Sequence, residues 1–350
     1  MNGILRHYWP DLLITALIGV CIAVFISPTT GLLAFGILVV LEISLSFDNA
    51  VVNAKVLERM SPFWQKMFLT VGLLIAVVGM RLLFPVIMVM VTAKLGFGET
   101  ITMALHDPHM YAEKLDIAHP SIAAFGGMYL LLIFLGFIFD DEKDVHWLRW
   151  LEAPFARIGK VDAVKYGIAT VLMLVAAQTW GEAHQVSVLI SGFTALAVFW
   201  LVSSIADLFE SEDEEDAGKP VRHGMGAFAL FMYLEMQDSA FSFDGVTGAF
   251  AITSSVVIIM AGLGVGALFV RSMTVHLVKT GQLSEYPYLE HGAHWAIGAL
   301  AACLLVSVGG IEVPEYITGP VGVVFIVAAI LHSKWESKRN EHAVVENAFV

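Results

Sequence analysis

The chain has 350 residues, of which 58% are hydrophobic and 15% are charged, and its formal net charge is −13. A typical soluble domain has about 25% charged residues, so this composition predicts an integral membrane protein rather than a soluble domain. No cluster is basic enough to bind nucleic acid. Both cysteines, Cys21 and Cys303, lie in apolar segments, which argues against a disulfide framework or a thiolate metal site.

Apolar runs of nearly twenty residues recur along the whole chain, and each could cross about 30 Å of hydrocarbon. We expect an all-α, polytopic membrane protein with about ten transmembrane helices. Their predicted ranges are 12–27, 31–52, 67–91, 121–139, 165–180, 187–208, 224–252, 255–278, 292–309 and 314–332. No cleavable signal peptide is expected, because the first run follows a single basic residue, Arg6, and no A-x-A-like site follows it.

Lysine and arginine are distributed unevenly between the segments that join these spans. With a cytoplasmic N-terminus, 15 of the 19 basic residues fall in inner segments, and only Lys94 and Lys114 fall in outer ones. The positive-inside rule therefore predicts a multi-pass protein of the inner (plasma) membrane with both termini in the cytoplasm. Arg81 and Arg271 lie within spans, where each either snorkels or contacts a backbone carbonyl, or pairs with a buried acid.

Two acidic segments inside apolar runs repeat each other. The first is Glu42-Ile-Ser-Leu-Ser-Phe-Asp48-Asn49, and the second is Asp238-Ser-Ala-Phe-Ser-Phe-Asp244-Gly245. On insertion scales an ionised side chain at the bilayer centre costs roughly 2.5–3.5 kcal/mol, so four acids at matched spacing predict a functional site.

The expected topology gives the two motifs opposite directions across the membrane. Inverted repeats with a site at their interface are a recurring plan of secondary transporters, so we predict an inverted-topology internal repeat. The predicted parts are a first transmembrane half at 1–208, an acidic cytoplasmic linker at 209–223, a second half at 224–332 and a cytoplasmic tail at 333–350.

Helix geometry limits how the motif acids can bind one ion. Six residues of a regular helix advance about 9 Å and turn about 600°, so Glu42 and Asp48 cannot share an ion unless the helix is broken. Either the acids form a ladder across the bilayer, or each Ser-Phe-Asp segment is a local break whose free carbonyls add ligands. Gly245 favours a break in the second copy.

The candidate site contains only oxygen ligands. The predicted metal ligands are Glu42, Asp48, Asn49, Asp238 and Asp244, supported by Ser46, Ser242, Glu235, Arg81 and Arg271. Such ligands suit Mn²⁺ or Ca²⁺, whereas thiolates would select Zn²⁺ or Cu⁺. Mutual repulsion raises the pKa of neighbouring buried acids, so protons are a candidate counter-ion. No resident cofactor is expected.

Both motifs resemble those of the TerC-like family, tellurium-resistance-associated membrane proteins of the LysE-type transporter superfamily. The family pattern E-x-x-L-S-x-D-N-A is matched from Glu42 to Ala50, and D-x-x-F-x-x-D is matched from Asp238 to Asp244. The run Ala249-Phe-Ala-Ile-Thr253 also resembles the family, but Gly-Val-Thr-Gly after Asp244 departs from it. The resemblance implies export of a divalent cation, most often manganese, from bacteria.

The leading interpretation is a secondary transporter of divalent cations in a lipid membrane, not an enzyme. Two alternatives stay open: an intramembrane aspartyl protease using Asp48 and Asp244, and a non-transporting partner in a metal or tellurite stress complex. The sequence is also compatible with a homo-oligomer. Elsewhere we interpret 92–120, with His106, His109 and His119, as an exposed outer loop, 210–216 as a solvated acidic linker and 141–160 as an interfacial helix.

Overall fold

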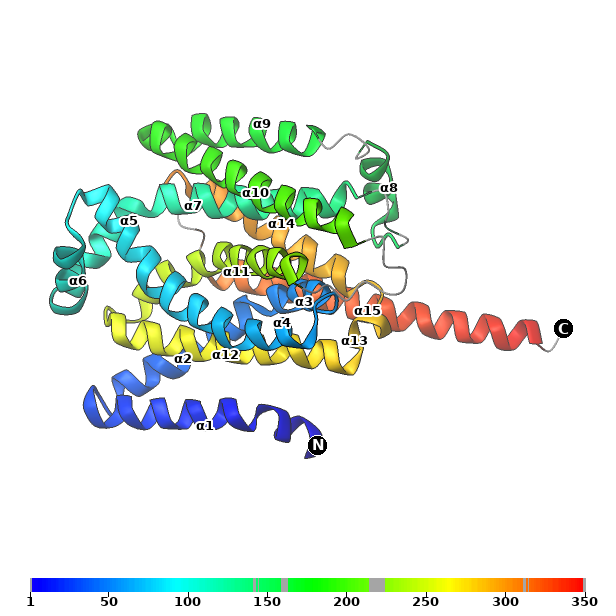
Figure 1. The fold of residues 1–350 in the computed structure, drawn as a ribbon, viewed down its shortest axis with the longest axis horizontal. Helices are drawn as coiled ribbons and strands as arrows, with labels where there is room; N and C mark the ends of the chain where they lie inside the picture. The colour runs from blue at the N-terminus through cyan, green and yellow to red at the C-terminus, as the bar shows by residue number, and fades with distance from the viewer. Residues whose placement is uncertain are drawn as a thin grey trace.

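A computed structural model describes residues 2–140, 143, 145–158, 163–213, 224–310, 313 and 315–348. Every regular element in this part of the chain is a helix, and most helices run along a common direction (Figure 1). The protein is therefore an all-α, polytopic membrane protein. The two termini lie at the same end of the bundle, together with α8 (Arg149–Ile158) and α13 (Gln282–Glu285), whereas α6 (Phe97–His106) lies at the opposite end (Figure 1).

The helices follow the predicted spans closely. In chain order the remaining elements are α1 (Asn2–Phe25), α2 (Thr30–Leu45), α3 (Phe47–Leu57), α4 (Pro62–Met67), the π-helical segments η1 (Phe68–Gly72) and η2 (Ile75–Leu83), α5 (Phe84–Ala93), α7 (Pro108–Ile138), α9 (Ala163–Thr179), the short 3₁₀ segment η3 (Glu182–His184), α10 (Gln185–Asp213), α11 (Gly224–Ile252), α12 (Val256–Thr280), α14 (Leu289–Ser307) and α15 (Glu315–Ala348).

Six stretches of the described chain are long and apolar enough to cross a membrane: His7–Phe25, Pro62–Ala93, Pro108–Ile138, Glu182–Ile205, Val256–Thr280 and Leu289–Ser307. The bent pair α2–α3 makes a seventh, so this count stays below the ten predicted spans. Helices do occupy the other three predicted ranges. Of these, α9 has only 17 residues, and α11 has three acids within its apolar sequence.

The predicted outer loop at 92–120 is wrong, because most of it is helical. The Asp107 carboxylate accepts a hydrogen bond from the Met110 backbone nitrogen at 3.2 Å, and Pro108 follows at the first helical position, so α7 begins there. His119 is buried in this helix. The α10 helix also extends to Asp213, into the predicted acidic linker, and residues 214–223 lie outside the described part.

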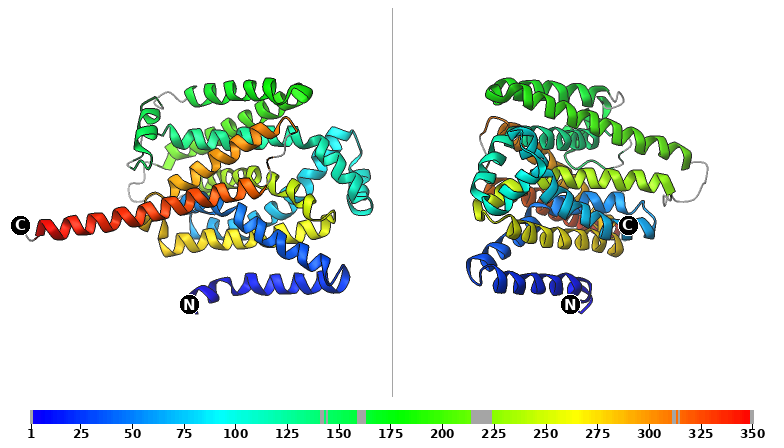
Figure 2. Two further views of the ribbon diagram at one scale, coloured as in Figure 1. Left: turned by 180° about the vertical axis from the view of Figure 1, so that it is seen from behind. Right: turned by 60° about the vertical axis from the view of Figure 1, so that its left-hand side comes forward.

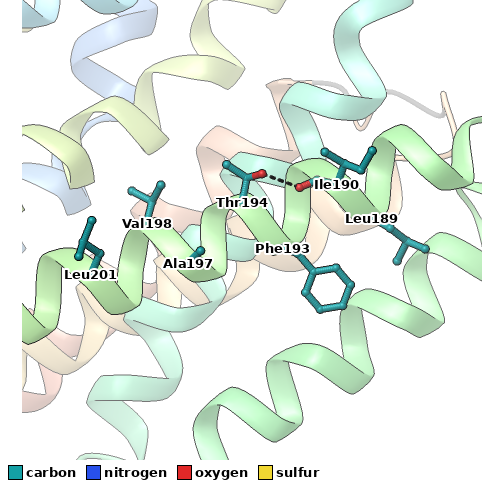
Figure 3. Close-up of a pocket in the computed structure, with 7 residues that line it drawn as sticks. All are labelled: Leu189, Ile190, Phe193, Thr194, Ala197, Val198 and Leu201. Carbon is teal, nitrogen blue, oxygen red and sulfur yellow. Dashed lines mark hydrogen bonds between the residues drawn. The ribbon is translucent and has the colours of Figure 1, made fainter.

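Burial separates central helices from peripheral ones. The apolar window of α7 is 78% buried, whereas that of His7–Phe25 in α1 is 17% buried. The α1 helix and the α9–α10 pair lie on opposite sides of the bundle, and α15 extends beyond it (Figure 2). An open apolar hollow of about 550 Å³ lies along α10, lined by side chains such as Leu189, Phe193 and Leu201 (Figure 3). Such exposed apolar faces suit contact with lipid.

Candidate functional site

The first motif contains a break in the membrane helix. The α2 and α3 helices meet at Ser46 with a bend of 53°, and Ser46 has non-helical dihedral angles (φ −101°, ψ 16°). Glu42 therefore lies in the last turn of α2, and Asp48 lies in the first turn of α3. Of the two alternatives left open by the sequence, a ladder of acids or a local break, the first copy has the break, and it removes the helical geometry that would have kept the two acids on different faces.

The second motif has no such break, because α11 is helical from Gly224 to Ile252. The alternative of a local break, which Gly245 favoured for this copy, is therefore wrong for the second motif. Gly245 instead allows a close approach: a methyl group there would lie 3.3 Å from Oε2 of Glu42. The glycine therefore makes room for the acid of the other motif.

Contacts between the two motifs show that they lie side by side and antiparallel. The Asn49 side-chain nitrogen, at the end of the first motif, donates to Oδ1 of Asp238 at 2.6 Å, at the start of the second. Glu42, at the start of the first motif, faces Gly245, at the end of the second. This is the arrangement expected for two copies that cross the bilayer in opposite directions.

The first acid of each motif is paired with an arginine from the next membrane segment of the chain. Arg81 of η2 donates through Nη2 to Oε1 of Glu42, and through Nη1 to the Ala76 carbonyl at 2.8 Å. Arg271 of α12 donates to Oδ2 of Asp238 at 2.8 Å. The two roles considered for these arginines, pairing with acids and binding backbone carbonyls, therefore occur together.

Arg271 has a larger set of partners than Arg81. Its two terminal nitrogens each lie 3.0 Å from an oxygen of Glu235, and Nη1 also donates to the Phe68 carbonyl at 2.6 Å. The guanidinium group lies 4.2 Å from the centre of the Phe68 ring. Gly72 packs against this group, where any side chain would overlap Glu235 and Arg271. The sequence placed Glu235 near the site but did not indicate this bidentate pair.

A buried cavity of about 20 Å³ lies at the helix break. It is lined by Glu42, Leu45, Ser46, Asp48, Phe241, Gly245, Ala296, Leu300, Thr318 and Gly322. A cavity of this volume holds one water molecule or one ion without its hydration shell. The last four lining residues come from α14 and α15. Nothing in the sequence indicated them, because none of these four residues is acidic and none belongs to a repeated motif.

Residues 47–340 match a family model described as "Protein of unknown function (DUF475)". The chain belongs to this family. It is also 30% identical over 143 residues to the "Uncharacterized membrane protein YceF" of Bacillus subtilis (strain 168), a match that covers 39% of this chain and 55% of that protein. The chain thus spans about half the length of this curated relative. No solved structure matches the chain.

Within this DUF475 protein, Asp48 differs from the other described motif acids. It has no ion-pair partner among the described side chains, and its Oδ1 accepts a hydrogen bond from the Asn49 backbone nitrogen at 2.9 Å. Its place in the first turn of α3 puts the carboxylate at the positive end of the helix dipole, which stabilises a negative charge. Asp48 is therefore a carboxylate that faces the cavity without a compensating arginine.

The predicted ligands do not all meet at this cavity. Glu42 and Asp48 line it, whereas Asp238 and Asn49 bond each other beside it. Ser242 donates to the Asp238 backbone carbonyl at 2.9 Å. Among the described side chains, no group of three or more His, Cys, Asp or Glu could hold a metal ion. The side chain of Asp244 lies outside the described part, so its predicted role stays a prediction.

A further buried acid, outside both motifs, lies at the end of the bundle that contains both termini. Glu152 of α8 is 0% exposed, and it accepts hydrogen bonds from the Trp147 backbone nitrogen at 3.1 Å and the Trp295 indole at 3.0 Å. Nδ1 of His291 lies 2.9 Å away. Burial alone would raise the pKa of Glu152, but His291 and Trp295 lower it to about 2. Glu152 therefore fastens α8 to α14, one of the helices that line the cavity.

Proposed function

We propose that this protein is a secondary transporter that exports a divalent cation, with manganese favoured and calcium second. The observation that carries the proposal is the buried carboxylate of Asp48, which lacks an ion-pair partner among the described residues and faces an ion-sized cavity at a helix break. Acids inside a membrane are costly and mark ion pathways. Broken helices at the interface of antiparallel repeats are a common form of transporter site.

The chemistry of the cavity supports a hard cation. The oxygen-bearing side chains that line it are Glu42, Ser46, Asp48 and Thr318. The Oε1 atom of Glu42 accepts from Ser46 at 3.1 Å and from Arg81, whereas Oε2 points toward Gly245. Oxygen ligands of this kind suit Mn²⁺ and Ca²⁺. The resemblance of both motifs to the TerC-like family favours manganese and a role in metal or tellurite tolerance.

The size of the cavity favours transport of an ion over intramembrane proteolysis. An aspartyl protease must admit a peptide bond with its flanking residues between two carboxyl groups. A volume of about 20 Å³ is too small for this. A non-transporting role in a stress complex makes a different prediction, because deletion of the protein would then leave cellular manganese unchanged.

Sealed, inverted membrane vesicles test the proposal directly. Vesicles that contain the full chain should accumulate Mn²⁺ when a proton gradient is imposed, and the Asp48→Asn variant should not. Glu99→Gln, at an exposed acid of α6, is the matched control and should transport normally. Vesicles with and without the wild-type protein that take up Mn²⁺ equally would overturn the proposal.

We further propose that both termini face the cytoplasm of a bacterial inner membrane. The support is the uneven distribution of basic residues, together with the position of both termini at one end of the bundle and α6 at the other (Figure 1). A cysteine in place of the exposed His109 should react with an impermeant reagent added to intact spheroplasts. Labelling only after lysis would reverse the orientation.

A further inference from the structure

The α15 helix contributes a hydroxyl to the cavity that neither motif contains. Thr318 is 9% exposed, and its Oγ1 atom has no hydrogen-bond partner among the described residues. Buried polar groups in native proteins nearly always have a partner, so a hydroxyl left without one requires an explanation. The cavity that it lines also contains Asp48, a carboxylate without an ion-pair partner in the part of the chain that the structure describes.

Gly322, one turn further along α15, places the helix backbone beside Asp48. A methyl group at this position would lie 4.0 Å from Oδ2 of Asp48 and 3.8 Å from Cβ of Ala296, which is ordinary contact without overlap. Residues four apart lie on the same face of a helix, so Thr318 and Gly322 present one face to the cavity. This face supplies the hydroxyl oxygen of Thr318 and, at Gly322, space that a side chain would otherwise fill.

The volume of the cavity determines whether an ion can enter together with its hydration shell. About 20 Å³ leaves no room for a cation together with a shell of water molecules. A cation that enters must exchange hydration waters for protein oxygens. Mg²⁺ gives up its waters reluctantly and usually keeps several of them, whereas Ca²⁺ accepts six to eight oxygen ligands in flexible geometry.

We propose, resting on the transport function above, that Thr318 is a ligand that replaces a hydration water and selects Mn²⁺ or Ca²⁺ against Mg²⁺. Asp48 supplies the charge, and the Thr318 hydroxyl supplies a neutral oxygen from the second half of the chain. Gly322 sets the width of the cavity. Selectivity then depends on α15, a helix that contains neither of the acidic motifs.

The test is binding of MnCl₂ to the purified full-length protein in lipid nanodiscs, alone and in competition with MgCl₂ or CaCl₂. Thr318→Val removes the hydroxyl at nearly constant volume and should weaken Mn²⁺ binding about tenfold. Thr318→Ser keeps the oxygen and should restore binding to within about threefold of the wild type. Gly322→Ala should weaken binding of the larger Ca²⁺ more than that of Mn²⁺.

Gly36→Ala is the matched control, because a methyl group at this exposed position of α2 meets nothing within 4 Å. Its Mn²⁺ affinity should equal that of the wild type. If the wild type binds Mn²⁺ and both Thr318→Val and Gly322→Ala bind it equally well, the role of α15 is overturned while the transport function stands. A wild-type protein that binds neither Mn²⁺ nor Ca²⁺ would instead overturn the transport function itself. If Thr318→Val fails to fold, Gly322→Ala decides, and wild-type affinity of that variant for both Ca²⁺ and Mn²⁺ would overturn the role of α15.

Discussion

The two acidic motifs have the same spacing but different backbones. The first bends by 53° at Ser46, whereas the second lies within the unbroken α11. Their equivalent serines account for part of the difference in bonding. Ser46 donates to the side chain of Glu42, whereas Ser242 donates to the backbone carbonyl of Asp238, a bond that keeps it within its own helix. One copy therefore opens a cavity, and the other forms a straight wall beside it.

Charge pairing differs between the copies as well. Among the described side chains, Arg81 pairs with one acid, Glu42, whereas Arg271 is shared by two, Glu235 and Asp238. Both motifs therefore contain an acid–arginine pair, but the surroundings of the two pairs differ. We expect the contacts around the cavity of the first copy to contribute more to transport and the arginine pairs of the second copy to contribute more to stability, and the following variants test this division.

The largest effect is expected at Asp48. Asp48→Asn should reduce Mn²⁺ transport by at least about 100-fold, because it removes the carboxylate that faces the cavity without an arginine partner. Asp244→Asn should abolish transport as well if its carboxylate completes the site. Expression and elution as a single species in detergent should remain normal. Vesicle uptake that matches the wild type in either variant would contradict the model of paired motifs.

The two arginine variants should differ in the free energy of unfolding, because they leave different numbers of acids unpaired. Arg271→Gln leaves two buried carboxylates without a cation and should destabilise the protein by about 3–5 kcal/mol. Arg81→Gln leaves one such carboxylate among the described side chains, Glu42, and should cost less. Thermal unfolding followed by fluorescence-detected size exclusion measures both. Adding Glu235→Gln to Arg271→Gln should recover part of the loss, and equal melting temperatures for the two single variants would contradict the ranking.

A smaller difference in Mn²⁺ transport is expected between variants of the equivalent serines. Ser46→Ala removes a hydrogen bond to Glu42 at the cavity and should lower Mn²⁺ transport about three- to tenfold. Ser242→Ala removes a bond to its own helix and should leave transport within about twofold of the wild type. The ratio of the two initial uptake rates is the measurement. Serine variants with indistinguishable rates would mean that the broken and the straight motif contribute equally.

The smallest effect is expected at Glu152, which lies outside both motifs. The hydrogen bonds of Glu152 lower its pKa from 4.5 to about 2. A depressed folded-state pKa stabilises the docked α8 fully above about pH 4.5, and this contribution is lost as the pH falls toward about 2. Indole fluorescence of Trp147 and Trp295 should therefore change over this range in the wild type. Glu152→Gln should remove that transition, and an unchanged pH profile in the variant would show that another group causes it.

Helix positions were predictable from the sequence because apolar runs of membrane length leave few alternatives. The pairing of the two acidic motifs was also predictable from their repeated spacing. The sequence could not show which of the two motifs is broken, because Ser-Phe-Asp occurs in both. Only the surroundings of Ser46 and Gly245 distinguish the two copies. Thr318 and Glu152 carried no local signal, because their importance arises from residues more than a hundred positions away.

The arginine pairs also affect how the protein would respond to voltage. Arg81 balances the charge of Glu42, and Arg271 is shared by Glu235 and Asp238, so Asp48 is the described motif acid that contacts no guanidinium group. Moving one elementary charge through 100 mV changes the free energy by about 2.3 kcal/mol, so a dication leaving a negatively charged cell interior requires about 4.6 kcal/mol. With Asp48 and the carboxylate that Arg271 leaves unbalanced, the described ionised acids carry two negative charges in excess of the two arginines, and these match the charge of a dication. The loaded site would therefore be close to neutral, and inward movement of protons through the same potential would supply the energy for export.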